Sequence, residues 1–128
     1  MTKRKAVQTD IAPAAMGPYS QALLMGNTLY ISGQLGIDPA TGKMVDGPTA
    51  AQAEQALKNI MAILMEANMS MHNVVQAQVF LADIGDFSAV NEVYKTFFAE
   101  PYPARAAIQA GALPAGGSVE ILVTAVNV

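Results

Sequence analysis

The sequence predicts an α+β fold in which two helices cover one face of a single mixed sheet. Three observations support this prediction. The 128 residues suffice for one domain, taken as residues 1–128. Two segments have helical periodicity, and the remaining apolar runs are short and β-prone. The elements follow the order β-β-α-β-α-β-β. Because both helices would lie on one face of the sheet, the other face needs a cover, for which a partner subunit is the simplest candidate.

The first two strands are expected at residues 20–25 and 28–32. Gly26-Asn27 joins them, and a glycine in the first position of a two-residue connection suits a type II′ hairpin. Residues 33–48 are rich in Gly, Pro, Asp and Thr, which predicts a loop with a turn near residues 38–42.

The first helix is expected from Thr49 to about Asn68. Thr49 and Gln52 match a capping box, in which the hydroxyl and the amide serve free N–H groups of the first turn. The helix would bury an apolar stripe consisting of Ala53, Ala56, Leu57, Ile60, Met61 and Leu64.

The second half of the chain predicts three strands and one helix. Residues 74–83 alternate, with Val75, Ala77, Val79 and Leu81 on one face. A helix is expected to begin near Asp86, a favoured N-cap residue, and to bury Phe87, Val90, Tyr94 and Phe97. The last two strands are expected near residues 106–110 and 118–127, joined by a turn at 113–117.

The composition bounds the possible partners. Charged residues make up 13% of the chain, against about 25% in an average soluble domain, so apolar surface is expected to meet another subunit. No apolar run reaches the ~20 residues of a membrane span, and Met1–Lys5 is not followed by the apolar stretch of a secretory signal. We therefore expect a cytoplasmic oligomer that has no membrane partner.

Several classes of site are excluded by residue counts. The chain has no cysteine and one histidine, His72, which excludes disulfides, thiolate metal sites and histidine-cluster metal sites. The net charge is −3, and three of the seven basic residues lie at positions 3–5, which argues against nucleic acid as a partner. Neither a phosphate-binding loop nor a dinucleotide fingerprint is present.

Arg105 and Glu120 are the only charged residues between positions 101 and 128. Arg105 follows two prolines, and its planar guanidinium matches a carboxylate. Glu120 lies in an apolar strand, where alternation places it with Leu122 and Thr124, and burial there should raise its affinity for protons. The two side chains either form a structural ion pair or define a pocket for a small carboxylate or zwitterion.

Six motifs in register resemble the RidA (YjgF) family of reactive-intermediate imine deaminases. The resemblance covers residues 12–126. The motifs are Gly17-Pro-Tyr-Ser-Gln-Ala22, Ile31-Ser-Gly-Gln34, Asn59, Val90-Asn-Glu-Val-Tyr94, Pro103-Ala-Arg105 and Val119-Glu-Ile121. The resemblance implies a chorismate-mutase-like fold and a homotrimer with ligand clefts between subunits. It also implies hydrolysis of 2-imino or 2-enamino acids, such as 2-aminoacrylate and 2-iminopropionate, to 2-keto acids and ammonia without a cofactor.

The resemblance also implies roles for individual residues. Arg105 would grip the substrate carboxylate, and Glu120 would hold the attacking water or shuttle its proton. Tyr19, Ser32 and Asn91 would line the pocket, and the backbone carbonyl of Ala107 would accept a hydrogen bond from the imine nitrogen.

The chain departs from the family pattern in two places. Many relatives carry cysteine at position 107, where this chain has alanine, so thiol chemistry is excluded while a role of the carbonyl remains available. The segment at residues 98–103 is shorter than in some relatives, which could reshape one rim of the cleft and so the substrate range.

Three other functions remain open at the level of sequence. A trimer that binds or senses a 2-keto acid without turnover would use Arg105 equally well, and the loss of Glu120 separates it from an enzyme. Ribonuclease activity or translation inhibition is disfavoured by the shortage of basic residues and the lack of a histidine pair. Chaperone-like holding has only the 52% hydrophobic content in its support.

Overall fold

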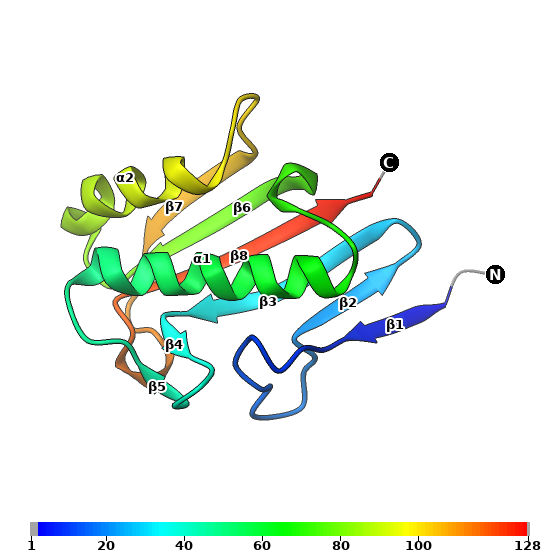
Figure 1. Ribbon diagram of the computed structural model, residues 1–128. Coiled ribbons are helices and arrows are strands. Elements are labelled where there is room, and N and C mark those ends of the chain that lie inside the picture. The colour runs from blue at the N-terminus through cyan, green and yellow to red at the C-terminus, as the bar shows by residue number, and fades with distance from the viewer. Residues whose placement is uncertain (1–2, 128) are drawn as a thin grey trace.

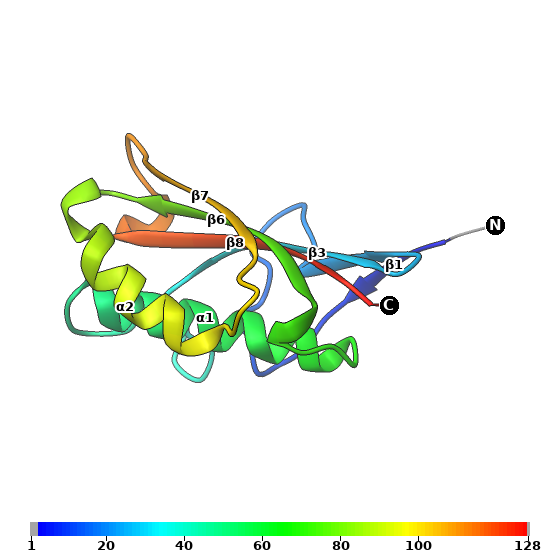
Figure 2. The same ribbon diagram turned by 90° about the horizontal axis from the view of Figure 1, so that it is seen from above.

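The computed structural model describes residues 3–127, in which a six-stranded sheet is covered on one face by two helices (Figures 1 and 2). The part of the segment Met1–Lys5 that precedes Lys3 lies outside the described residues. The sheet contains β1 (Arg4–Val7), β2 (Ala22–Met25), β3 (Thr28–Leu35), β6 (Val74–Leu81), β7 (Ala104–Gln109) and β8 (Val119–Val126). The other elements are the hairpin β4 (Ile37–Asp38) and β5 (Lys43–Met44), the helices α1 (Thr49–Glu66) and α2 (Phe87–Phe97), and single turns η1 (Met71–Asn73), η2 (Ile84–Asp86) and η3 (Pro114–Gly116).

The strand order in the sheet is β1-β2-β3-β8-β6-β7. All neighbouring strands are antiparallel except β6 and β7, which are parallel and are connected through α2. The prediction of one mixed sheet with both helices on one face is therefore confirmed. β8, drawn in red in Figure 1, lies between β3 and β6 and joins the two halves of the sheet.

The hydrophobic core lies between the sheet and the helices. Alternate residues of β8 point into it, and each is at most 1% exposed; they are Val119, Ile121, Val123 and Ala125. The predicted alternation of this strand is confirmed, because Glu120, Leu122 and Thr124 point to the opposite face. Residues 3–127 leave that face uncovered, and Tyr30 and Ile108 are 53% and 52% exposed.

Strands extend beyond the prediction at β1, at the end of β3 and at the hairpin β4–β5, which lies within the predicted loop of residues 33–48. β1 was missed because three of its four residues are exposed and two are basic, so it has no apolar alternation to recognise. β3 continues to Leu35, although residues from 33 onward were expected in a loop, and its register with β8 shifts between Ile31 and Gln34. An irregularity of this kind interrupts the pattern of a strand without ending it.

The predicted capping box at the start of α1 is wrong. Pro48 occupies the N-cap position, and the Thr49 hydroxyl donates to the carboxylate of Asp86 at 2.8 Å. The Gln52 side chain accepts a hydrogen bond from the backbone N–H of Ser118 at 2.9 Å. Partners distant in sequence therefore replace the local ones. Asp86 does stand at the N-cap position of α2, as predicted, but its side chain makes no capping bond.

Val75 does not share a face with the alternating residues that follow it. The pairing of β6 with β8 shifts between Val74 and Gln76, so Val74 is 6% exposed and Val75 is 49% exposed. The shift adds one residue to β6, so the side chain of Val75 leaves the buried face. The other predicted positions, Ala77, Val79 and Leu81, are buried as expected.

Candidate functional site

Glu120 lines a cavity of about 670 Å³ on the open side of the sheet, which we call the Glu120 pocket. Its wall combines residues of β3 and β8 with the segments before β2 and after β7; it includes Tyr19, Ser32, Gly33, Leu35, Ala115 and Leu122. The Ser32 hydroxyl donates to the carbonyl of Ser20 at 2.6 Å, which ties β3 to the segment that carries Tyr19. The Tyr19 hydroxyl accepts from the backbone N–H of Met16 at 3.3 Å.

The carboxylate of Glu120 lies directly over Gly33. A Cβ atom added at Gly33 would lie 2.8 Å from Oε2 of Glu120 and 2.9 Å from its Cδ. Burial raises the pKa of Glu120 above its ordinary value of 4.5, as expected for a carboxyl group on an apolar strand. The arrangement gives a partly desolvated carboxylate that can accept a proton from a water molecule in the pocket.

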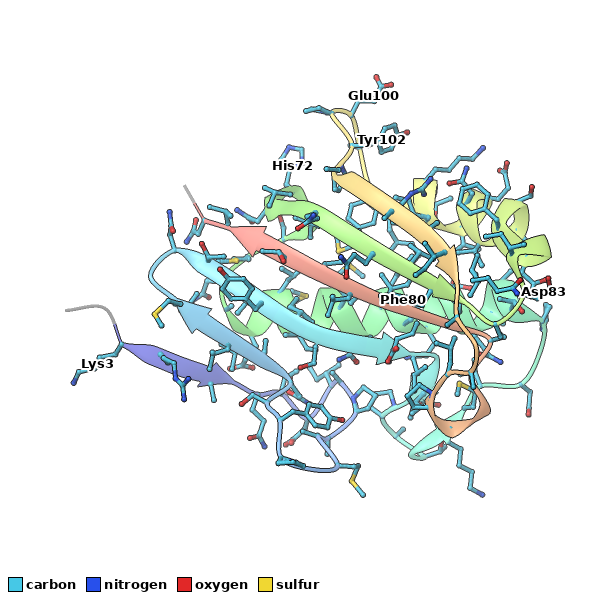
Figure 3. The ribbon with its side chains drawn as sticks, turned by 180° about the vertical axis from the view of Figure 1, so that it is seen from behind. Lys3, His72, Phe80, Asp83, Glu100 and Tyr102 are labelled. Atoms are coloured by element: carbon cyan, nitrogen blue, oxygen red, sulfur yellow. The ribbon has the colours of Figure 1, made fainter. Side chains whose placement is uncertain are left out.

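Arg105 lies at the start of the edge strand β7, beside α2. Its Nη1 donates to Oδ1 of Asn91 at 2.8 Å. Its guanidinium carbon lies 4.7 Å from the ring centroid of Tyr94 and 5.3 Å from that of Phe87. Two cavities, of about 430 and 580 Å³, adjoin this guanidinium, and Ala107 lines the larger one. We call this region the Arg105 pocket; the smaller cavity also contacts Tyr102, in the loop that joins α2 to β7 (Figure 3).

The two pockets lie on opposite faces of the same sheet. Arg105 pairs in register with Ala77, which pairs with Val123, and both partners are buried beneath the helices. Glu120 pairs with Phe80, whose side chain lies on the face away from α1 (Figure 3). One subunit therefore cannot bring Arg105 and Glu120 to the same small ligand.

The structure divides the predicted site residues into two groups. Tyr19 and Ser32 gather around Glu120, whereas Asn91 and Ala107 lie beside Arg105. The alternative of an internal Arg105–Glu120 ion pair is contradicted, because across residues 3–127 the salt bridges are Lys58–Glu54 and Lys95–Glu92.

Gly33, Phe87 and Tyr94 are among the pocket residues that were not expected there. Gly33 was assigned to a loop, and no local signal shows that a side chain from β8 crosses it. Phe87 and Tyr94 were predicted only as a buried stripe of α2. Phe87 lies four residues before Asn91 and Tyr94 three residues after it. Residues at these spacings share one helix face, so the position of Asn91 could have predicted that both rings lie in the same pocket.

Between positions 3 and 127, no three His, Asp or Glu side chains are grouped so that they could ligate a metal ion. None of the helices in that part of the chain combines the length and the apolar character needed to cross a bilayer.

Comparison with known proteins shows extensive similarity. A family profile described as Endoribonuclease L-PSP matches residues 9–127. The 2-iminobutanoate/2-iminopropanoate deaminase of Bos taurus is 58% identical over 124 residues, covering 97% of this chain and 90% of the relative. The Homo sapiens protein of the same name is 51% identical over the same shares.

Solved structures agree with this result. The crystal structure of RidA from the Antarctic bacterium Psychrobacter sp. superimposes with a TM-score of 0.93 at 52% identity, covering 96% of this chain and 99% of that one. Escherichia coli TdcF with bound serine superimposes with a TM-score of 0.92 at 37% identity, covering 97% and 99%. With a matching profile over nearly its whole length and relatives above 50% identity, this chain belongs to the RidA (YjgF/L-PSP) family.

Proposed function

We propose that this protein is a 2-iminobutanoate/2-iminopropanoate deaminase, which hydrolyses 2-imino acids to 2-keto acids and ammonia. The observation that carries the proposal is its 51–58% identity, over 97% of the chain, to relatives of that name. The chemistry of the two pockets supports it. The Arg105 pocket offers a cation that can bind the substrate carboxylate, and the Glu120 pocket offers a carboxylate that can take a proton from the attacking water.

Arg105 is the proposed anchor for the substrate carboxylate. A guanidinium has five N–H donors in a planar fork, so the bond from Nη1 to Asn91 leaves donors free for a second, bidentate partner. The carbonyl of Ala107, two residues further along β7, is the proposed acceptor for the imine N–H, which would keep the imine protonated and electrophilic. Asn91 lines the same pocket.

Glu120 is the proposed base. Its carboxylate takes a proton as water adds to C2 of the protonated imine, and the product is a tetrahedral carbinolamine. The proton then passes from Glu120 to the amino nitrogen, and the C–N bond breaks as the Glu120 carboxylate takes the proton of the carbinolamine hydroxyl, which forms the keto C=O and releases ammonia. Ammonia takes that proton from Glu120 and leaves as ammonium, so the carboxylate is regenerated. A pKa raised by burial makes Glu120 a stronger base than an exposed glutamate. Tyr19 and Ser32 would form the wall against which the substrate lies.

The site requires residues from two copies of the chain, because Arg105 and Glu120 lie on opposite faces of the sheet. We infer a homotrimer in which the Arg105 pocket of one subunit meets the Glu120 pocket of the next. Contact between two different patches, repeated head to tail, forms a closed ring when the rotation between copies closes, and the family resemblance implies a ring of three copies. The exposed Tyr30 and Ile108 on the open sheet face would become buried in this assembly. We place this trimer in the cytoplasm.

The test generates 2-aminoacrylate in situ with a pyridoxal-phosphate dehydratase acting on serine and follows the appearance of pyruvate. Wild-type protein should accelerate pyruvate release, and Arg105→Ala and Glu120→Ala should each abolish the acceleration. Lys43→Ala, on the exposed hairpin β4–β5, is the matched control and should behave as wild type.

Light scattering on the same samples tests the trimer, and a stable monomer would contradict the composite site. Absence of acceleration with several imino acids would exclude the deaminase. Affinity for a 2-keto acid that survives in Glu120→Ala, without any turnover by the wild type, would then identify a binding protein.

A further inference from the structure

The guanidinium of Arg105 lies over two aromatic rings of the same helix. Its central carbon lies 4.7 Å from the ring centroid of Tyr94 and 5.3 Å from that of Phe87, both within the roughly 6 Å range of cation–π attraction. The amide oxygen of Asn91 accepts from Nη1 at 2.8 Å. Three side chains of α2 therefore contact one arginine of β7.

These contacts use different parts of the guanidinium. Aromatic rings attract the flat face of the cation, whereas its N–H donors point outward in the plane of the group. The rings thus restrict the tilt of the plane and leave the in-plane donors available. Asn91 engages one terminal nitrogen, and the Arg105 side chain lines both adjoining cavities.

Tyr94 contributes its ring and not its hydroxyl. The residue is 4% exposed, and its hydroxyl is buried without a hydrogen-bond partner in the described chain. Burial raises the pKa of this phenol, and Arg105 partly opposes the rise, so the group is neutral at physiological pH. The contact between Tyr94 and Arg105 is therefore made by the ring, whose centroid lies 4.7 Å from the guanidinium carbon.

We propose that Phe87 and Tyr94 are positioning residues, whose rings hold the guanidinium of Arg105 in the plane that receives the substrate carboxylate. The proposal rests on the role of Arg105 as carboxylate anchor given above. An arginine without this support would lose the freedom of a long side chain when ligand binds, which would weaken binding. The two rings therefore act on substrate affinity more than on the rate of the chemical step.

The test measures binding of 2-oxobutanoate, the expected product of 2-iminobutanoate, by titration calorimetry. Tyr94→Leu and Phe87→Leu keep apolar volume and remove the ring face, and each should weaken binding about two- to five-fold, the size of one cation–π contact at a partly exposed site. Tyr94→Phe keeps the ring and should bind as wild type. In the imine assay, the leucine variants should raise KM and leave kcat nearly unchanged.

A double-mutant cycle separates positioning from general packing. If the rings act through Arg105, Tyr94→Leu and Phe87→Leu should cost no further affinity in an Arg105→Ala background. Equal losses in both backgrounds, or wild-type affinity in both leucine variants, would overturn the proposal. Phe87 is only half-buried, so Phe87→Leu keeps the test decisive if Tyr94→Leu does not fold.

The two proposals fail in different ways. Binding of 2-oxobutanoate that depends on Arg105, without imine hydrolysis, would refute the deaminase function. The double-mutant cycle would then still decide whether Phe87 and Tyr94 position Arg105. Binding that does not change in Arg105→Ala would overturn the positioning role, whatever the outcome of the imine assay.

Discussion

Replacing Gly33 by alanine should reduce activity strongly while leaving the fold almost unchanged. An added Cβ would lie 2.8 Å from Oε2 of Glu120, whereas ordinary van der Waals contact begins at about 3.4 Å, so the carboxylate must move by at least 0.6 Å. The atom in the way is the end of a flexible side chain. It can rotate aside without moving the backbone, and the φ angle of Gly33 does not require glycine.

The expected loss follows from the size of that displacement. Misplacing a catalytic group by about 1 Å can cost on the order of 100-fold in rate. For a shift of at least 0.6 Å we expect kcat for imine hydrolysis to fall roughly 10- to 100-fold. KM should change less, because the proposed carboxylate anchor Arg105 lies on the opposite face of the sheet.

The assay compares Gly33→Ala with Gly36→Ala. A Cβ at Gly36 would lie 2.6 Å from Cα of Gln52 and 2.7 Å from its carbonyl oxygen, both in the backbone of α1. Gly36→Ala should therefore lower the melting temperature, whereas Gly33→Ala should melt near wild type. Wild-type kcat in a folded Gly33→Ala protein would refute the reasoning that Glu120 acts from its observed position.

Three further predictions concern stability. Because burial raises the pKa of Glu120, its protonated form favours folding; this contribution is complete below 4.5 and is lost as pH rises through the folded-state value. Glu120→Gln should therefore be more stable than wild type at pH 7 in urea titrations, with the advantage shrinking toward pH 4; an advantage that grows in acid would contradict the sign. Asn59 is fully buried and donates to the carbonyls of Leu35 and Ile37, so Asn59→Leu, which removes both hydrogen bonds, should lower the free energy of unfolding by about 1–3 kcal/mol; an unchanged urea midpoint would contradict this. Ala115 has φ 56°, a left-handed conformation that glycine adopts without strain. Ala115→Gly should therefore raise the free energy of unfolding by about 0.5–1 kcal/mol after the entropy of glycine is subtracted, whereas Ala112→Gly, at a position without positive φ, should not raise it.

The sequence predicted best the parts of the fold that bury an apolar pattern. The alternation around Glu120 was correct, because one face of β8 packs on the core, and in the predicted stripe of α2 Val90 and Tyr94 are buried while Phe87 and Phe97 are half-buried. The prediction failed where contacts distant in sequence decide the outcome. Thr49 and Gln52 fit a local cap, yet their partners are 37 and 66 residues away.

The site was predictable in composition but not in arrangement. Arg105 and Glu120 stand out because a charge in an apolar segment costs free energy unless it has a partner. Their placement on opposite faces depends on the register of β6 with both β7 and β8, which one sequence does not encode locally. The crossing of Glu120 over Gly33 likewise depends on the pairing of two distant strands.

The position of β8 has a consequence for synthesis of the protein. This strand is the last in the described chain, yet it lies in the middle of the sheet, and its pairing of Val126 with Thr28 joins residues 98 positions apart. Until it is made, β1–β3 and β6–β7 have no hydrogen-bonded link, and each set exposes an unpaired strand edge that invites association with other chains. A nascent chain should therefore remain vulnerable to aggregation and proteolysis until β8 has emerged, and a product truncated before Val119 should be degraded rather than persist as a partly active protein.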